Sequence, residues 1–573
     1  MDAVSRRRWF PRGTPPDNTA VGALALRLGL PPLVARLLLG RGLPEAAVAE
    51  FLSARLADLP DPFLLPDMER AAGRIAAAVR RGEEIAVHGD YDVDGMSGTA
   101  LLVEGLRACG ASAGYHIPLR LKDGYGLSEA ALRDAAAGGR RLVVSVDCGV
   151  SAHGEARLAR ELGLDLIITD HHQPPPQLPE AFAVINPQRA DSAFPFRDLA
   201  GVGVAFFLLV AVRRELRESG WFAERPEPDL RAVLDLVALG TIADLVPLQG
   251  VNRTLTRIGL GVLERGERPG IRALRTVSGI GKVNCGTVAF QLAPRLNAAG
   301  RLDDASRGVE LLLGRDVDAV VETAQLLDRF NRDRQQIELQ TLEEATAMVA
   351  ALPPERTHSI VLACDAWHPG VIGIVASRLV ERYYRPTVLI AMDGEGGKGS
   401  ARSIRGLHLY RALHECAGHL LAFGGHEMAA GLSVAREQVE TFSLAFEAAA
   451  RQHLSADDLA PSLLYDGTVS LAELPLATIA FLESLAPFGM GNPEPVFLIE
   501  RLRGRQLQKV GGSHLRFLAC REGEAVPAIA FGMADRLAEF QGDVDLLVSP
   551  QVNRYNGRET VQLRVRDVRS AAS

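Results

Sequence analysis

The chain has 573 residues, of which 47% are hydrophobic and 23% are charged, and its net charge is −7. This length is typical of about three or four domains, and the composition is that of a globular protein that needs no disulfide staples. The negative net charge argues against a surface broadly covered by phosphate-binding groups, but it allows a local basic channel.

The cysteine pattern and the N-terminus bear on the cellular compartment. Six cysteines are scattered along the chain and none forms a C-x-x-C pair. This pattern excludes a zinc knuckle and fits a reducing compartment. Residues 6–8 are basic but precede no apolar stretch, and the apolar run 28–39 is broken by prolines and Arg36. We expect no signal peptide, no membrane span and a cytoplasmic location.

The first half of the chain predicts an α/β architecture. Residues 1–65 are expected to form an N-terminal helical segment with Gly/Pro breaks. Short apolar strands then alternate with helical stretches, which predicts a mostly parallel sheet. The expected strands are 85–87, 142–146, 166–169 and 183–185, and the expected helices are 97–108, 202–218 and 229–240.

The second half begins with a stretch that favours one long helix. Between Gly314 and Pro353 there is neither glycine nor proline. One helix would reach roughly 50 Å at 1.5 Å per residue, and two shorter core helices are the alternative. Residues 357–450 predict a second α/β domain. Residues 462–573 alternate apolar and polar positions between glycine-rich turns, which predicts a small β barrel.

The end of the chain is locally basic, since residues 501–573 carry 12 lysines and arginines against 8 acidic residues. Barrels of this type commonly bind single-stranded nucleic acid through basic grooves and stacking aromatic side chains. Phe517, Phe531 and Tyr555 are the candidates, although a core role is favoured for the two phenylalanines.

Three clusters of carboxylates and imidazoles each follow a predicted strand. His88, Asp90, Asp92 and Asp94 lie within seven positions after the first strand. Carboxylates this close repel one another unless cations neutralise them. A solvated acidic turn is the alternative, but such a turn needs one or two aspartates rather than three with a histidine.

The other two clusters are Asp147 and the run Asp170, His171 and His172. A lone aspartate after a strand is often a helix cap. Three clusters at successive strand ends, however, are expected to converge on the ligand crevice of an open parallel sheet. Carboxylate and imidazole without cysteine favour Mn²⁺ or Mg²⁺, and so many ligands exceed the needs of one ion. Two ions would serve phosphoryl displacement.

Asp170-His171-His172, together with His88-x-x-x-Asp92-x-Asp94, resembles the signature of the DHH phosphoesterases. The resemblance implies a bridging carboxylate at Asp147 and a last ligand at Asp244. It implies one metal on His88, Asp92 and Asp147, and a second on Asp94, Asp147, His171 and Asp244. Asp90 and His172 would then lie behind the ligands or face the substrate, and Asp170 would orient an imidazole.

The resemblance covers roughly residues 65–573 and implies five parts. These are the N-terminal segment 1–65, a DHH catalytic domain 66–313, a connecting helix 314–353, a DHHA1-like nucleic-acid-binding domain 354–455 and an OB-like barrel 460–573. The family's larger members carry a further C-terminal domain, which we do not expect here.

The segments that support the resemblance also contain the expected nucleic-acid and phosphate ligands. Glycine allows close approach of the backbone to a phosphate, and arginine offers bidentate contacts. In isolation, an ordinary turn is an equal reading of the glycines, and a solvated surface position is the default for Arg402. The expected residues are Arg301, Ser400, Arg402, Gly424, Gly425 and His426.

The resemblance is strongest to a branch of the family that degrades single-stranded DNA 5′→3′ to 5′-mononucleotides in recombination and repair. It implies single-stranded DNA as the substrate, with a single-strand-binding protein and a RecQ-type helicase as partners. One rival is a DHH oligoribonuclease that also dephosphorylates nucleotides, but such chains usually have no OB domain. Another is a non-catalytic DNA-binding relative, which would have lost metal ligands that this sequence retains.

Overall fold

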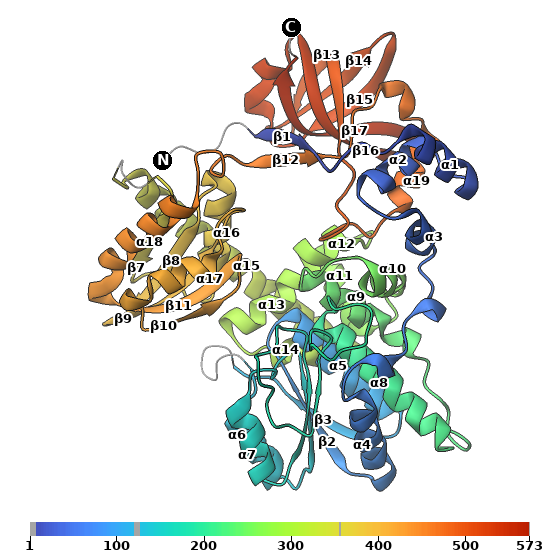
Figure 1. Cartoon of the computed structure of the whole chain (residues 1–573), viewed down its shortest axis with the longest axis vertical. Coiled ribbons are helices and arrows are strands. Elements are labelled where there is room, and N and C mark those ends of the chain that lie inside the picture. The colour runs from blue at the N-terminus through green and yellow to red at the C-terminus, as the bar shows by residue number, and fades with distance from the viewer. Residues whose placement is uncertain (1–6, 120–125, 354–356, 572–573) are drawn as a thin grey trace. The chain divides into compact units, whose positions relative to one another are not determined.

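The computed structural model describes residues 7–119, 126–353 and 357–571. They form two compact units, whose elements are labelled in Figure 1. The larger unit comprises residues 11–327 and 464–573, and the smaller comprises residues up to 10 together with 328–463.

The larger unit contains a five-stranded sheet in the order β3-β2-β4-β5-β6, in which every neighbouring pair is parallel. This confirms the predicted parallel sheet. The order reverses between β2 and β4, which is where open α/β sheets bind their ligands. The strands are β2 (Glu84–Gly89), β3 (Ser112–His116), β4 (Leu142–Val146), β5 (Asp165–Thr169) and β6 (Ala183–Ile185).

Strand β3 was not predicted, because it is a short edge strand of small and polar residues with only one buried position. Helix α5 also begins earlier than expected, at Val93, since the side chain of Asp92 accepts a hydrogen bond from the Gly95 N–H at 3.0 Å and caps the helix. The capping therefore brings the acidic cluster onto the first turn of a helix.

Helices make up most of the remainder of residues 66–313 of the larger unit. No single described helix is long and apolar enough to cross a membrane, although α1 and α2, bent by 119° at their break, meet that test as a pair by length and composition. The helices are α4 (Met68–Arg81), α5 (Val93–Ala108), α6 (Glu129–Ala137), α7 (His153–Glu161), α8 (Gly201–Glu218), α9 (Leu234–Ala243), α10 (Gly250–Arg265), α11 (Pro269–Ser278), α12 (Cys285–Thr287), α13 (Ala293–Leu302) and α14 (Ser306–Leu313).

Arg268, at the N-cap of α11, ties together the helices that carry the acidic residues. Its Nε lies 2.7 Å from Asp235 on α9, and its Nη1 donates to Glu104 on α5 and to the Leu312 carbonyl on α14. Only 4% of the Arg268 and Asp235 side chains is exposed. This buried network fixes α5 against α9.

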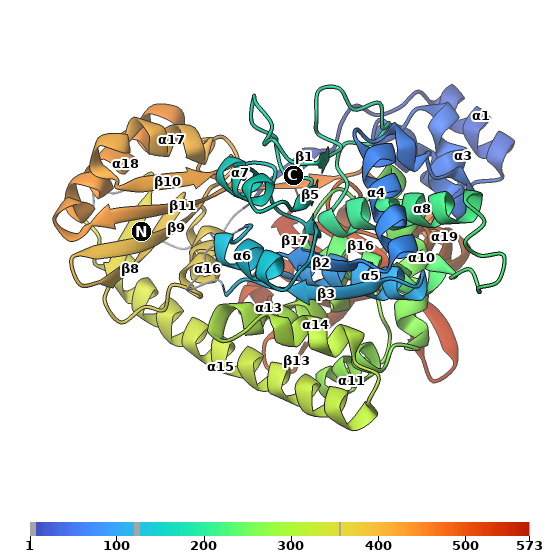
Figure 2. The ribbon, with the colours of Figure 1, turned by 90° about the horizontal axis from the view of Figure 1, so that it is seen from below.

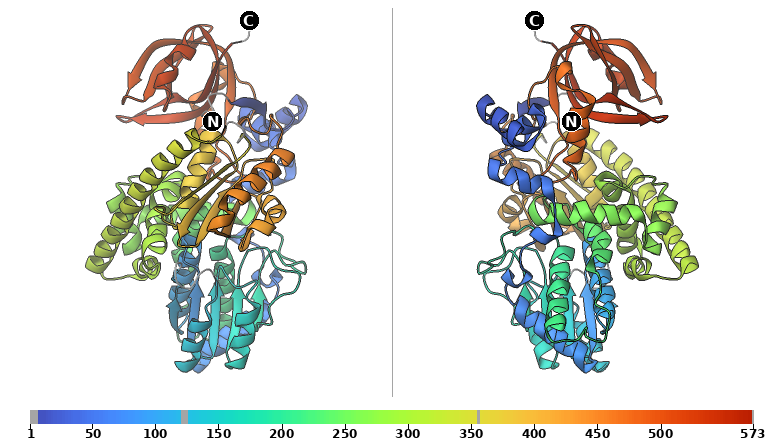
Figure 3. Two further views of the ribbon diagram at one scale, coloured as in Figure 1. Left: turned by 90° about the vertical axis from the view of Figure 1, so that its left-hand side faces the viewer. Right: turned by 90° about the vertical axis from the view of Figure 1, so that its right-hand side faces the viewer.

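The chain ends in a closed barrel, as predicted (Figure 3). Its strands follow the order β13-β14-β15-β17-β16. Phe517 is buried in its core, whereas Phe531 is 46% exposed, so the expected core role of Phe531 was wrong. The strands are β13 (Phe497–Val510), β14 (His514–Arg521), β15 (Glu524–Ala530), β16 (Asp543–Tyr555) and β17 (Arg558–Ser570).

The N-terminal helices share one hydrophobic core with this barrel, which the sequence did not indicate. Buried residues of α1 (Asn18–Leu28) and α2 (Pro32–Gly40) belong to the same cluster as barrel residues such as Phe497. Arg41, after α2, adds a bidentate pair with the buried Asp466, at 2.8 and 3.0 Å. Helices α3 (Glu45–Ser53) and α19 (Leu476–Ser484) complete this region.

The long helix is one continuous element, α15 (Val317–Ala350, 34 residues), as Figure 2 shows. The alternative of two shorter helices is therefore wrong.

The smaller unit contains a five-stranded sheet in the order β10-β11-β9-β8-β7, in which only β7 and β8 are parallel. Its elements are β7 (Ile360–Cys364), α16 (Ile372–Tyr383), β8 (Thr387–Asp393), β9 (Gly396–Arg402), α17 (Leu409–Glu415), β10 (Ala422–Gly425), β11 (Ala429–Ala435) and α18 (Val439–His453).

Replacing Arg268 tests the buried network. Arg268→Ala should lower the free energy of unfolding of the larger unit by about 3–5 kcal/mol, because it leaves Asp235 buried without its cation. Arg265→Ala, which removes an exposed ion pair with Glu267, should cost about 1 kcal/mol or less. Urea unfolding followed by circular dichroism measures both, and equal losses would contradict this role of Arg268.

Candidate metal centre

The acidic cluster lies at the junction of β2 and α5. Asp90 and Asp94 are 2% and 1% exposed. Asp94 accepts hydrogen bonds from the backbone N–H groups of Gly201 and Val202, at 2.6 and 3.0 Å. These two groups belong to the first turn of α8, so the positive end of that helix stabilises the carboxylate.

Asp147 follows β4 directly and has a left-handed backbone with φ of 63°. Its own N–H donates to the Thr169 carbonyl of β5 at 2.9 Å, which holds this conformation. A non-glycine residue in this region is uncommon and is a recurrent feature of functional sites.

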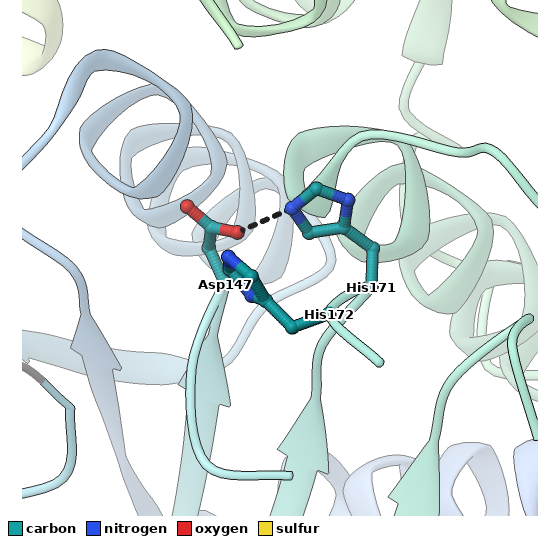
Figure 4. Close-up of side chains that lie close together, drawn as sticks. All are labelled: Asp147, His171 and His172. Carbon is teal, nitrogen blue, oxygen red and sulfur yellow. Dashed lines mark ion pairs between the residues drawn. The ribbon is translucent and has the colours of Figure 1, made fainter. Parts of the chain in front are cut away.

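The two histidines after β5 contact different aspartates, and Figure 4 shows His171 beside Asp147. The Asp170 carboxylate accepts a hydrogen bond from His172 Nδ1 at 2.7 Å. It also accepts hydrogen bonds from the backbone N–H groups of His171, His172 and Val150. Asp170 thus holds the imidazole of His172, and its expected role toward a metal-bound histidine stays a prediction. The Nε2 atom of His171 lies 3.1 Å from the Asp147 carboxylate and 3.5 Å from that of Asp244.

Asp244 is the C-cap residue of α9, and its Oδ2 atom reaches the same crevice, 3.5 Å from His171 Nε2. Two glycines leave room for the carboxylates. A Cβ atom on Gly201 would lie 2.5 Å from Asp147 Oδ1, and one on Gly240 would lie 2.6 Å from Asp94 Oδ1. Any larger residue at either position would displace a carboxylate.

Burial and mutual repulsion keep these aspartates from being stable anions in the absence of cations. Burial, with the charge of Asp92 adding to it, raises the pKa of Asp94 to about 7. Burial and the charges of Asp94 and Asp92 raise the pKa of Asp244 to about 9. The pKa of Asp147 is also well above its usual value, for the same two reasons.

The histidines respond in opposite directions. Burial lowers the pKa of His171 to about 4, so its imidazole is neutral at pH 7 and its contact with Asp147 is not an ion pair. Burial also opposes the charge on His172. Its hydrogen bond to Asp170 and the negative charges of Asp170, Asp92 and Asp94 together outweigh burial and raise its pKa. A neutral imidazole is the form that binds a metal.

The residues fit divalent cations. His171 Nε2 and Asp244 Oδ2 are buried and have no hydrogen-bond partner among the described residues, which is costly unless an ion occupies the space between them. Carboxylates and imidazoles without a thiolate suit Mn²⁺ or Mg²⁺. Three sets have ligand atoms within 4.8 Å of one another: Asp94, His171 and Asp244; Asp90, Asp92 and Asp147; and Asp147, His171 and His172.

These sets overlap at Asp147 and His171, as expected for two adjacent ions, but they differ in two respects from the expected ligands. The Nε2 atom of His88 lies 3.2 Å from the Gly126 carbonyl, and Asp90 rather than His88 groups with Asp92 and Asp147. His172 also groups with Asp147 and His171, although it was expected to lie behind the ligands or to face the substrate. The ligand role of His88 and the outer roles of Asp90 and His172 stay predictions.

Helix α13, which carries the expected nucleic-acid ligand Arg301, contacts the acidic cluster. Asn297 on α13 accepts the Val93 N–H at 3.2 Å, and a Cβ atom on Gly300 would lie 2.8 Å from the Tyr91 carbonyl. Arg301 lies in the last turn of the same helix. The sequence showed this segment only through the family resemblance, because its partners lie some 200 positions away in the chain.

In the smaller unit, Ser400 and Arg402 lie together on β9. The Arg402 guanidinium donates to Ser400 Oγ at 3.1 Å, and a Cβ atom on Gly373 would meet both side chains at 2.8 and 3.0 Å. Gly373 belongs to the first turn of α16, so a serine, an arginine and the start of a helix lie side by side. Such N-termini bind anions.

Gly424 and Gly425 end strand β10, and His426 begins the turn that leads to β11. Gly425 has φ of 144°, and a Cβ atom there would lie 2.5 Å from the Ala429 carbonyl, so the turn requires glycine. The N–H of His426 donates to the same carbonyl at 2.8 Å. All three residues are exposed and available to a ligand.

The fold and the carboxylate crevice define a DHH-type domain, and comparisons with known families agree. The family model described as "DHH family, N-terminal domain" matches residues 84–241, and the DHHA1 domain matches residues 357–452. The model of the RecJ OB domain matches residues 465–567.

Individual relatives show which kind of DHH protein this chain resembles. The chain is 42% identical to the single-stranded-DNA-specific exonuclease RecJ of Dickeya dadantii, over 94% of this chain and 96% of that protein. It superposes on the RecJ of Thermus thermophilus in complex with Mn²⁺ with a TM-score of 0.84 and 32% identity, covering 99% of this chain and 80% of that one. A Mg²⁺ complex of the Thermus protein gives a TM-score of 0.78 at 31% identity, with 99% and 79% of the two chains covered. The chain belongs to the RecJ family.

Gly201→Ala tests the space reserved for Asp147. The added methyl group would push the carboxylate away, so Mn²⁺ affinity measured by calorimetry should fall by about 10- to 100-fold. Gly203→Ala, two residues further along α8, meets nothing closer than 3.4 Å and should bind Mn²⁺ like the parent protein. A Gly201→Ala protein with unchanged Mn²⁺ affinity would refute the close packing.

The pH dependence of metal binding follows from the raised carboxyl pKa values. Because Asp94 and Asp244 hold protons up to pH values of about 7 and about 9 in the metal-free protein, a cation must displace those protons. Mn²⁺ affinity should therefore increase as the pH rises through this window. Calorimetry at pH 7 in buffers of different ionisation heat should detect proton release, and a pH-independent affinity without release would be inconsistent with these shifts.

Proposed function

We propose that this protein is a metal-dependent exonuclease that hydrolyses single-stranded DNA with two Mn²⁺ or Mg²⁺ ions. The observation that carries this proposal is the crevice in which three ligand sets overlap at Asp147 and His171. Its family membership supports the same activity. DNA recombination and repair are the processes that such an enzyme would serve.

The chain's own residues would hold, orient and shield the reacting groups. Asp147, Asp92 and Asp94 would bind cations with His171 and Asp244, and the first turn of α8 would keep Asp94 in place. When bound, two cations supply the Lewis acidity and the charge balance for displacement at phosphorus. Asp170 fixes the Nδ1 side of the His172 imidazole, so that the opposite side of the ring would face the substrate phosphate.

Two rival functions receive less support. An oligoribonuclease or nucleotide phosphatase of the DHH family would not require the OB domain that residues 465–567 match. A non-catalytic single-strand-binding relative would not require buried carboxylates that repel one another. Asp90, Asp147, Asp170 and His172 are all present and buried or half-buried around the crevice.

The proposal extends to direction and products. Ser400 and Arg402 on β9, beside the start of α16, would recognise the 5′-terminal phosphate, which bears more charge than an internal one. Degradation would then run 5′→3′ and release 5′-mononucleotides. Arg301, Gly424, Gly425 and His426 would hold the strand. By family resemblance, we add a cytoplasmic location and, as partners, a single-strand-binding protein and a RecQ-type helicase.

Asp147→Ala tests the metal centre directly. Hydrolysis of end-labelled single-stranded DNA should fall below about a tenth of the wild-type rate, since a bridging ligand contributes several kcal/mol of charge stabilisation. Exhaustive chelation should abolish wild-type activity, and Mn²⁺ or Mg²⁺ should restore it. Retained activity in the variant, or full activity after chelation, would remove Asp147 from a two-metal site.

Arg402→Ala tests the end-recognition pocket. Its activity on 5′-phosphorylated single strands should fall far more than its activity on 5′-hydroxyl strands, because only the former carry the terminal charge. Arg405→Ala, an exposed arginine three residues further along, should treat both substrates like the parent. Equal losses on both substrates would mean that Arg402 grips the backbone generally, and release of nucleotides from the 3′ end would exclude the proposed direction.

A further inference from the structure

An apolar groove is lined by residues on both sides of Asp244 in the chain, among them Ile242 and Leu245. Its volume is about 170 Å³, and its lining includes Leu245, Cys285, Phe290, Phe488 and Met490. All of these residues belong to the larger unit. Three of them are largely exposed, since Phe290 is 82%, Leu245 64% and Met490 59% accessible. Large apolar side chains that gather at one exposed place mark an interaction site.

The groove is held rigid from both sides. Met490 lies in a tight turn in which Gly489 and Asn492 exchange backbone hydrogen bonds at 2.9 and 3.2 Å. The Asn492 side chain, 4% exposed, donates to the carbonyls of Leu485 and Pro487 and locks this turn. The exposure of Met490 is therefore built into the fold and does not result from a loose loop.

The same turn is fastened to the segment that follows the metal-site aspartate. The Leu248 N–H donates to the Met490 carbonyl at 2.8 Å, and the Gln249 side chain donates to the Gly491 carbonyl at 2.7 Å. A Cβ atom on Gly489 would lie 2.8 Å from Leu248, so the two segments approach closely. The groove and the metal centre thus share one short segment of chain.

Two local backbone features direct apolar side chains into this groove. Leu245 has a left-handed backbone with φ of 61°, which is uncommon for leucine and costs conformational energy. Phe290 lies in a π-helical turn, η4 (Val288–Leu292). Such turns are rare and recur at functional sites. Neither feature is needed to bury these side chains, because both remain exposed.

We infer that this groove binds an unpaired nucleobase of the DNA strand whose phosphate lies at the metal centre. This inference rests on the proposed function. A strand held at Asp244 must pass beside Leu245, and a base offers the flat apolar face that Phe290 and Met490 can cover. The groove is smaller than the roughly 300–1,000 Å³ of a pocket for a drug-sized ligand, which suits a single base.

The groove would also contribute to the choice of single strands. In a duplex, the faces of the bases are stacked on their neighbours and are not available to Phe290. A base that inserts into the groove must be unstacked and unpaired. The groove would therefore favour single-stranded over duplex DNA at a position adjacent to the reacting phosphate. This selection would not depend on the barrel.

The test is equilibrium binding with strands that have one base-less sugar at successive positions. Fluorescence anisotropy of 5′-phosphorylated single strands is measured with the Asp147→Ala protein, which should not cut them, and with the wild-type protein in chelator. One base-less position should weaken binding about tenfold, as expected for the loss of one stacked base. Adding the Phe290→Ala substitution should weaken binding of the intact strand by the same factor. It should also abolish the effect of a base-less sugar at that one position.

Matched variants complete the design. Phe290→Tyr should retain the effect of the base-less sugar on binding. Leu26→Ala, which removes an exposed leucine of α1, should leave the affinity for every strand unchanged. The inference is overturned if Phe290→Ala and Met490→Ala bind every strand like the parent, or if they weaken all base-less strands equally. Hydrolysis by the wild-type protein with Mn²⁺ is measured in parallel. Binding that depends on Phe290 without any hydrolysis would refute the nuclease proposal and leave the groove assignment standing.

Discussion

Mutual repulsion among buried aspartates is the constraint on which this structure depends. Asp90, Asp94, Asp147 and Asp170 are each no more than 2% exposed, although they come from three separate segments of the chain. A buried carboxylate is stable only when it is hydrogen-bonded, protonated or bound to a cation. Asp170 is satisfied by the protein itself, through four hydrogen bonds from His171, His172 and Val150. Asp147 and Asp244 instead have raised pKa values, which is the signature of a site prepared for cations.

The rest of the larger unit holds these repelling groups together. The parallel order of β2, β4 and β5 brings three clusters to one edge of the sheet. The start of α8 contributes N–H groups to Asp94, and glycines at 201 and 240 leave room for the carboxylates. Arg268 keeps α5 and α9 together through a network outside the crevice. The charge repulsion inside the site is thus offset by packing and by ion pairs outside it.

The sequence predicted this arrangement as far as local patterns reach. Apolar runs located β4 and β5, and the acidic residues after them located the crevice. Strand β3 escaped prediction because an edge strand needs no apolar run, and α5 began earlier because Asp92 is both a cap and a candidate ligand. Gly201 lies 54 positions from Asp147, and no periodicity links a glycine at a helix start to a distant carboxylate. The common core of α1, α2 and the barrel was equally invisible, since its two halves lie more than 400 positions apart.

The number of ions that the crevice holds, and the carboxylate that joins them, decide whether this is a two-metal centre. Crystals grown with Mn²⁺ and measured at an anomalous wavelength would give this answer without any assay of activity. We expect two anomalous peaks about 3.5–4 Å apart, with the Asp147 carboxylate contacting both and His171 and Asp244 on one of them. A single peak, or two peaks with Asp147 turned away from them, would contradict a bridged pair of ions.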